Sequence, residues 1–271
     1  MALCTATGDE YSPRIVSDSA GGAIVTWLDR RSLLSTWDIY AQHVNASGAI
    51  QWDPNGVPLC AATGDFAETI SDGAGGAIVT WNEERPPKDR DIYAQRVNAS
   101  GTVQWAPHGV ALCTAKGDQA FPTIVYDGAG GAIVTWYDKR SKTNCDIYAQ
   151  RVDASGAVQW TTDGVALCTA TGDQMNPTIT SDGASGAIVT WCDDRTRRLD
   201  IYAQRVNASG TVQWATDGVA LCTATWDQLG PRIVYDGAGG AIVVWEDQRS
   251  KSWHIYALRV SPNGSCAVNR N

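Results

Sequence analysis

The chain has 271 residues, 44% hydrophobic and 18% charged, which is the composition of a packed globular protein and not of a disordered one. Its formal net charge of −8, from 29 acidic and 21 basic side chains, argues against a protein that wraps nucleic acid or sits on an anionic membrane. No apolar run approaches the roughly 20 residues of a membrane span, and the first residues, Met-Ala-Leu-Cys-Thr, lack the pattern of a secretory signal.

Five copies of a repeat of about 54 residues account for nearly the whole chain, and a fixed period of this length is typical of repeat architectures. Each copy contains the phrase Gly-[Gly/Ser]-Ala-Ile-Val-[Thr/Val]-Trp, followed by Ile-Tyr-Ala. The tryptophans that end the first phrase are Trp27, Trp81, Trp136, Trp191 and Trp245. A later Gln-Trp phrase contributes Trp52, Trp105, Trp160 and Trp214.

The third copy shows the elements that we expect in each repeat. Short apolar or alternating runs predict strands over 122–127, 132–136, 147–152 and 157–160. Glycine-rich or Asx-type turns separate these runs, as in antiparallel hairpins. Residues 163–168 are expected to connect the fourth strand to the next repeat.

Four antiparallel strands in each of five repeats predict an all-β, five-bladed β-propeller that forms one domain over residues 1–271. The expected blades are approximately 10–60, 66–113, 119–168, 174–222 and 228–268. A solenoid is the alternative, although its repeats are usually shorter. Residues 1–9 match the end of a repeat, so we expect them to lie beside the fifth blade and close the ring.

The repeat contains Trp-x-[Asp/Glu]-x-Arg followed by Asp-Ile-Tyr-Ala-Gln-Arg, and it resembles the repeat arrays of secreted bacterial β-propeller proteins. The resemblance implies an extracellular or cell-surface location. It implies no single activity, because that family has none in common.

Alternating strand direction places the connections between second and third strands, and those between blades, on one face of the propeller. This loop-rich face carries the motif residues Trp27/Asp29/Arg31, Trp81/Glu83/Arg85, Trp136/Asp138/Arg140, Trp191/Asp193/Arg195 and Trp245/Asp247/Arg249. It also carries the inter-blade aspartates Asp9, Asp65, Asp118, Asp173 and Asp227. We favour a structural role, in which each arginine is forked between carboxylates and fixes neighbouring strands. Direct contact with a ligand is the alternative.

Three tryptophans fall outside the repeat pattern, namely Trp37, Trp226 and Trp253. In a closed ring the first and fifth blades are neighbours, so these side chains are expected to share one sector of the loop-rich face. Aromatic rings beside carboxylates and arginines suit a sugar, which offers an apolar face and hydroxyl groups. The alternative is that they only cover loops.

Metal and redox signals are weak in the sequence. Five cysteines recur at one repeat position and are expected to be small buried hydrophobes, whereas Cys4–Cys266 and Cys145–Cys192 are candidate disulfides. A ring of aspartates, Asp18, Asp72, Asp127, Asp182 and Asp236, ends the first strand of every blade. An Asx turn is favoured over a cation site there. We therefore expect no metal and no cofactor.

The sequence-based hypothesis is a non-catalytic recognition module that binds carbohydrate on the loop-rich face. Its candidate ligand-binding residues are Trp37, Trp226, Trp253, Asp29, Arg31, Asp227, Asp247 and Arg249. The main alternative is a protein-interaction scaffold, recently amplified or engineered, without a small ligand. A glycoside hydrolase ranks third, because a catalytic acid needs one special environment and these carboxylates occur in five equivalent copies. The expected partner is a glycan or a protein, and the expected state is a monomer.

Overall fold

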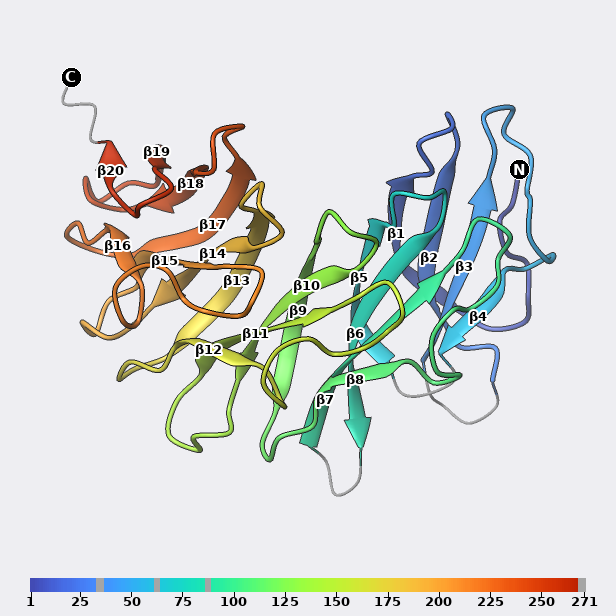
Figure 1. Cartoon of the computed structure of the whole chain (residues 1–271), viewed down its shortest axis with the longest axis horizontal. Helices are drawn as coiled ribbons and strands as arrows, with labels where there is room; N and C mark the ends of the chain where they lie inside the picture. The colour runs from blue at the N-terminus through green and yellow to red at the C-terminus, as the bar shows by residue number, and fades with distance from the viewer. Residues whose placement is uncertain (33–36, 61–63, 86–88, 268–271) are drawn as a thin grey trace.

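All regular structure in the computed structural model is β-strand, within the residues that it describes: 1–32, 37–60, 64–85 and 89–267. Over these residues no helix is long and apolar enough to cross a membrane. Five antiparallel sheets follow one another along the chain (Figure 1). The first two contain β1 (Glu10–Ser17), β2 (Ala23–Asp29), β3 (Asp38–Val44) and β4 (Val57–Cys60), then β5 (Gly64–Ser71), β6 (Ala77–Arg85), β7 (Asp89–Val97) and β8 (Val110–Cys113). The third contains β9 (Gln119–Tyr126), β10 (Ala132–Asp138), β11 (Asp146–Val152) and β12 (Val165–Cys168). The last two contain β13 (Gln174–Ser181), β14 (Ala187–Asp193), β15 (Asp200–Val206) and β16 (Val219–Cys222), then β17 (Gln228–Tyr235), β18 (Ala241–Asp247), β19 (His254–Val260) and β20 (Cys266–Ala267).

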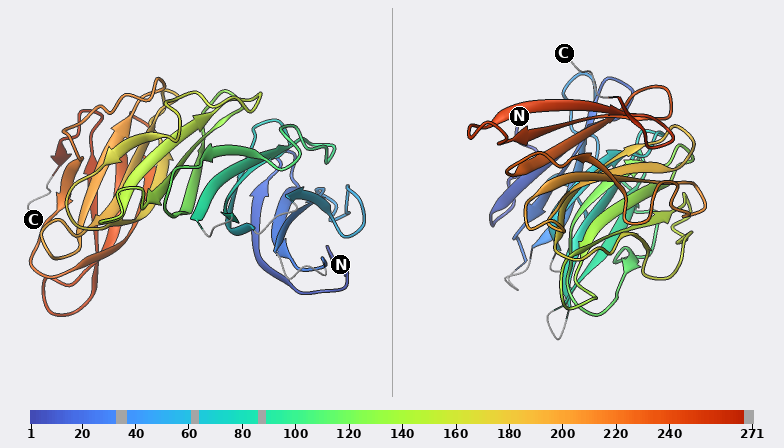
Figure 2. Two further views of the ribbon diagram at one scale, coloured as in Figure 1. Left: turned by 90° about the horizontal axis from the view of Figure 1, so that it is seen from below. Right: turned by 90° about the vertical axis from the view of Figure 1, so that its left-hand side faces the viewer.

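The five sheets are the blades of a β-propeller, as the sequence predicts. In each blade the strands are hydrogen-bonded in chain order, from the first strand to the fourth. The first strands β1, β5, β9, β13 and β17 pack side by side at the axis. The blades form a curved row in which each sheet faces the next (Figure 2).

The fourth strand lies later in the repeat than predicted. In blade 3 it is β12, and the predicted segment 157–160 makes only an isolated bridge between Val152 and Val158. The reason is the side chain of Gln150, which is fully buried. Its Oε1 accepts from the backbone N–H of Trp160 at 3.0 Å, and its Nε2 donates to the carbonyl oxygen of Thr161 at 2.8 Å. The amide therefore replaces the ladder and holds this segment as a loop.

Adjacent blades are joined by a repeated apolar interface. Between blades 3 and 4, Ile133 and Ile147 pack against Val189 and Trp191 of the following blade. The ring of Trp191 is fully buried, and its equivalents in blades 2 and 3 are buried to the same extent. Removing this apolar surface from water, at about 25 cal/mol per Å², is the main force that holds the blades together.

A tryptophan from the loop before the fourth strand, residues 157–160 in blade 3, also reaches across each interface. The indole N–H of Trp160 donates to the carbonyl oxygen of Ala208 in the next blade at 3.0 Å. Its ring lies over Gly210, which has a φ of +83° and where a Cβ atom would come within 2.7 Å of the ring. Glycine is required there on both counts. Trp52, Trp105 and Trp214 make the same contact with Ala99, Ala154 and Pro262.

The ring is open between blade 5 and blade 1, and the expectation that residues 1–9 close it is not met. This segment lies against its own blade 1, where the N–H of Thr5 donates to Asn55 Oδ1 at 2.7 Å and that of Arg30 to the carbonyl oxygen of Asp9 at 3.0 Å. Blades 1 and 5 occupy opposite ends of the row (Figures 1 and 2). Within the described residues, the hydrogen bonds that residues 1–9 make with a blade are all with blade 1, so this segment does not hold blade 5 against blade 1.

Candidate functional site

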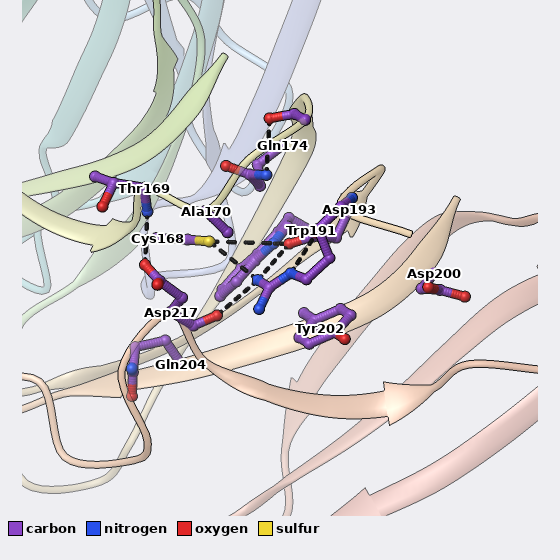
Figure 3. A network of polar contacts seen from close by, with 12 residues as sticks. Cys168, Thr169, Ala170, Gln174, Trp191, Asp193, Asp200, Tyr202, Gln204 and Asp217 are labelled. Carbon is purple, nitrogen blue, oxygen red and sulfur yellow. Dashed lines mark hydrogen bonds and ion pairs between the residues drawn. The ribbon is translucent and has the colours of Figure 1, made fainter. Parts of the chain in front are cut away.

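The Trp-x-acid-x-Arg motif forms an internal network, shown for blade 4 in Figure 3. The carboxylate of Asp193 is fully buried. It accepts from the indole N–H of Trp191 at 2.8 Å and from two nitrogens of Arg195, Nε at 2.8 Å and Nη2 at 2.6 Å. The three side chains are thus bonded to one another and not presented to solvent as a group.

The same arginine ties three segments together. Its Nη2 donates to the carbonyl oxygen of Asp217 before β16 at 2.8 Å and to Sγ of Cys168 in the preceding blade at 3.2 Å. Its guanidinium lies 3.9 Å from the ring centroid of Tyr202 on β15. The sequence-based expectation that the arginine is forked between two carboxylates is therefore not met. Arg195 binds one carboxylate and holds the strands around it together.

The network recurs along the chain. It comprises Trp27, Asp29 and Arg31 in blade 1, Trp136, Asp138 and Arg140 in blade 3, and Trp245, Asp247 and Arg249 in blade 5. In blade 2 the acid is Glu83, which accepts from Trp81 Nε1 at 3.3 Å, and the side chain of Arg85 lies outside the described residues. Burial opposes ionisation of Asp247, but hydrogen bonds from Arg249 and Trp245 outweigh it and lower its pKa to about 2.

The three tryptophans outside the repeat do not share one sector. Trp37, in blade 1, packs edge-on against Tyr11 with ring centroids 5.3 Å apart. Trp253 is exposed at the entry to β19 in blade 5, at the opposite end of the row. Trp226 is exposed before β17, with the guanidinium of Arg198 6.0 Å from its ring centroid. The open ring separates Trp37 from the other two.

The inter-blade aspartates hold the loops of the loop-rich face. Asp227 Oδ1 accepts from the N–H of Leu199 at 3.1 Å, and Asp173 Oδ1 from that of Cys145 at 2.8 Å. Asp65 does not belong to this series. Gly64 pairs with Glu83 as Gln119 pairs with Asp138, so Asp65 lies on the strand in the register of Ala120.

The aspartates that end the first strands are also engaged, as Asx turns. In blade 3, Asp127 Oδ1 accepts from the N–H groups of Ala129 and Gly131, each at 2.8 Å, while Oδ2 pairs with Arg151 at 2.8 Å. Arginines fill the second role in blades 2, 4 and 5, and His43 does so in blade 1. The Asx-turn interpretation is therefore confirmed.

Neither candidate disulfide is formed, because Cys4, Cys145, Cys192 and Cys266 are all thiols. The repeated cysteine is buried at Cys60, Cys113 and Cys168 but half-buried at Cys4 and Cys222. It is more than a small hydrophobe, because the motif arginine of the following blade donates to its Sγ, as at Cys168. Burial raises the pKa of Cys168 to about 12, so its thiol is not a nucleophile at neutral pH.

A hollow of about 280 Å³ lies at the propeller axis, and the first strands of all five blades line it. One repeat position that lines the hollow holds three residue types, arginine and threonine in two blades each and glutamate in one: Arg14, Glu68, Thr123, Thr178 and Arg232. Glu68 is the one carboxylate among the lining residues that the structure describes. Its Oε1 is 3.2 Å from both Nε and Nη2 of Arg14 in blade 1. We call this the axial pocket.

Two phenylalanines form an aromatic wall of the axial pocket. The ring centroids of Phe66 and Phe121 are 4.3 Å apart, and Tyr137 continues the cluster at 5.4 Å from Phe121. Both phenylalanines have positive φ, 52° and 53°, at a bulge near the start of the first strand. Ser12 and Asn176 have the same positive φ at the equivalent positions, so this conformation belongs to the repeated bulge, which turns the side chain at this position toward the axis.

Sequence reasoning missed Arg14, Phe66, Glu68 and Phe121. Residues that recur in every copy are the main signal in a repeat sequence, whereas these positions are those where the copies differ. The available signal was the variation of the first strand between repeats that are otherwise nearly identical.

Comparisons with known proteins identify the fold. No protein-family model and no curated protein matches the chain. Among solved structures, a protein of unknown function from Dyadobacter fermentans matches with a TM-score of 0.52 at 7% identity, over 97% of this chain and 82% of that one. An α-L-arabinanase from Penicillium chrysogenum, complexed with arabinobiose, matches with a TM-score of 0.50 at 11% identity, over 94% and 80%. An α-L-arabinofuranosidase from Fusarium graminearum matches with a TM-score of 0.50 at 10% identity, over 93% and 82%.

These comparisons contradict the hypothesis of a non-catalytic lectin-like module or scaffold. The arabinanase and the arabinofuranosidase are enzymes, and each covers more than nine-tenths of this chain. The argument that the carboxylates occur in five equivalent copies, and so cannot include a catalytic acid, also fails. Glu68 has no carboxylate at the equivalent position of any other blade. The chain thus shares the β-propeller fold with enzymes whose substrates contain arabinose, and it has one singular carboxylate at its axis.

Proposed function

We propose that this protein is a glycoside hydrolase that cleaves an arabinose-containing oligosaccharide in the axial pocket. The observation that carries the proposal is the Glu68 carboxylate, singular among the blades and held by Arg14 beside an aromatic wall. The arabinanase and arabinofuranosidase of the same fold support the choice of substrate class.

The axial pocket suits a sugar in size and chemistry. Its volume of about 280 Å³ is at the lower end of small-ligand sites, as expected for one or two sugar rings. The faces of Phe66 and Phe121 offer an apolar surface to the C–H groups of a sugar ring. Asn176, Thr178 and Arg232, on the opposite strands, supply polar groups for hydroxyls.

Glycosidic hydrolysis uses two carboxyl groups, one to protonate the leaving oxygen and one to act as base or nucleophile. Glu68, which is ion-paired with Arg14 across the interface of blades 1 and 2, supplies the carboxylate that acts as base or nucleophile. Asp65, three residues earlier on β5, is not among the residues that line the axial pocket, so the described lining supplies one carboxylate of the pair.

The test is a hydrolysis assay with linear and branched arabino-oligosaccharides and an aryl α-L-arabinofuranoside. We expect product release, and a loss of kcat by about 10²- to 10⁴-fold in Glu68→Gln, which is the usual range for removal of a general acid or base. Phe66→Ala is expected to raise KM. Asp53→Asn, which changes an exposed carboxylate outside the pocket, is the matched control. A folded wild-type protein without activity on these substrates, or a fully active Glu68→Gln variant, would overturn the proposal.

A further inference from the structure

We propose that the outer faces of blade 5 and blade 1 bind a second copy of this chain, head to tail. Every internal interface joins one face of a blade, which we call the leading face, to the opposite or trailing face of the next blade. In the part of the chain that the structure describes, the open ring leaves one leading face and one trailing face without a neighbour. These two faces are complementary halves of an interface that the molecule already contains between its other blades.

The leading face of blade 5 carries apolar side chains that are buried elsewhere. In blade 4, Ile188 and Ile201 are fully buried against blade 5. Their equivalents Ile242 and Ile255 are 41% and 74% exposed, and Val234 beside them is 59% exposed. Exposed clusters of this kind mark interaction surfaces on soluble proteins.

The trailing face of blade 1 shows the reciprocal pattern. Ile15 is 70% exposed, whereas its equivalents Ile124 and Ile179 pack against the preceding blade. Beside it, a hollow of about 230 Å³ is lined by residues that include Tyr11, Val25 and Trp27. A leading face with isoleucines at the usual positions would fill this hollow.

The N-terminal segment explains how the two faces join. In blade 4, β16 pairs with β15 through Cys222 and Ala220, opposite Ile201 and Tyr202. In blade 5, β20 pairs only with Arg259 and Val260, so within the described residues the stretch Ile255–Tyr256 of β19 has no such strand.

Residues 2–4 read Ala-Leu-Cys, as the fourth strands do, and they lie in blade 1 as a fourth strand of a preceding blade would lie. Arg31 donates to Cys4 Sγ at 3.3 Å, as Arg140 donates to Cys113 Sγ at 3.2 Å. A second copy therefore brings, already in place, the strand that β19 needs.

A second copy fits better than closure of one chain on itself. Blades 1 and 5 lie at opposite ends of the row (Figures 1 and 2), so closure within one chain would require all the internal interfaces to change their angle. Docking of a second copy requires no such change. The contact is heterologous, so it gives a closed ring of two or more chains or an open filament, according to the rotation between copies.

The test is the molar mass in solution, measured by sedimentation velocity over a range of concentrations. We expect the wild-type chain to form dimers or larger assemblies. Ile255→Glu and Ile15→Glu, each on one of the two faces, are expected to weaken self-association by about 100-fold or more, because either change buries an unpaired charge. Both side chains are largely exposed, so both variants should keep the wild-type melting temperature of a monomer. Val158→Glu, an exposed apolar position on neither face, is the control.

Mixing the two variants gives the decisive result. Each retains one intact face, so a 1:1 mixture should form a heterodimer and nothing larger, although neither variant associates alone. A wild-type chain that stays monomeric at all concentrations, or a mixture that does not associate, would overturn the proposal. The readout is mass and not activity, so its failure is independent of the proposed hydrolase function.

Discussion

The guanidinium of Arg140 lies over the ring of Tyr148, 3.8 Å from its centroid, while its fork binds the buried carboxylate of Asp138. The same stacking occurs at Tyr40, Tyr202 and Tyr256. An arginine bound in this way on both its edge and its face holds together the strands around it.

Arg140→Ala is therefore expected to lower the free energy of unfolding by about 3 kcal/mol or more, since it leaves Asp138 as a buried charge without its partner. Arg140→Lys should recover only part of this loss, because an ammonium group supplies neither the planar fork nor the stacking face. Urea denaturation of the three proteins measures the effect. An Arg140→Ala variant as stable as the wild type but unable to bind substrate would instead assign this arginine to the ligand site.

The fully buried Trp136 is expected to be a core residue of the blade 2–blade 3 interface. Trp136→Ala should cost about 3–5 kcal/mol, the usual range for truncating a large aromatic core residue. Trp253→Ala is the comparison, since that side chain is exposed, and its cost should be within about 0.5 kcal/mol of zero. A loss below about 1 kcal/mol for Trp136→Ala would contradict the packing described above.

The sequence predicts the blades because the property that defines them is periodic. Val134, Trp136 and Tyr148 recur in nearly identical phrases, so both the number of blades and the strand order follow from the repeat. The displacement of the fourth strand does not follow, since it depends on the side chain of Gln150 capturing the backbone of Trp160. A glutamine within a strand pattern gives no sequence signal of such a contact.

The candidate site was not predicted, because its residues are not periodic. Glu68 and Phe66 occupy positions without a repeated residue type, and only the meeting of five first strands at the axis makes these positions neighbours. The sequence does not predict the open ring either. Arg31 contacts Cys4 as Arg140 contacts Cys113, so the local packing of the N-terminal segment is the packing seen between joined blades, and its sequence carries no signal of the open ring.

The contact between Trp160 and Gly210 predicts strong coupling between two residues in different blades. Gly210→Ala should cost about 2 kcal/mol or more, because the new Cβ would meet the indole ring at 2.7 Å and φ is +83°. In the double variant Trp160→Ala/Gly210→Ala the steric part of this cost disappears. The two losses should therefore be less than additive by about 1 kcal/mol, as expected for residues in contact. Strict additivity in thermal or urea denaturation would show that this tryptophan does not clasp the next blade.

The paired carboxylates Asp138 and Asp146 lie opposite each other on β10 and β11, and they predict a dependence of stability on pH. Burial, with a further contribution from the negative charge of Asp138, raises the pKa of Asp146 from 3.8 to about 6. Between about pH 4 and pH 6 the folded state therefore holds a proton on Asp146 that the unfolded state has released. The contribution of this group is fully present below about pH 4 and is lost as the pH rises to about 6.

Asp146→Asn removes this ionisation and keeps an oxygen to accept from Asn144. We expect it to raise the free energy of unfolding at pH 7 by about 1–3 kcal/mol, and to change it little at pH 4. Asp153→Asn is the matched control, since its hairpin position holds asparagine in blades 1, 2 and 4 and its pKa is lowered, first by the hydrogen bond from Ser155. That variant should gain nothing at pH 7. Urea titrations at several pH values between 4 and 8 compare the two, and an Asp146→Asn variant whose gain is the same at pH 4 and pH 7 would mean that Asp146 does not titrate in this range.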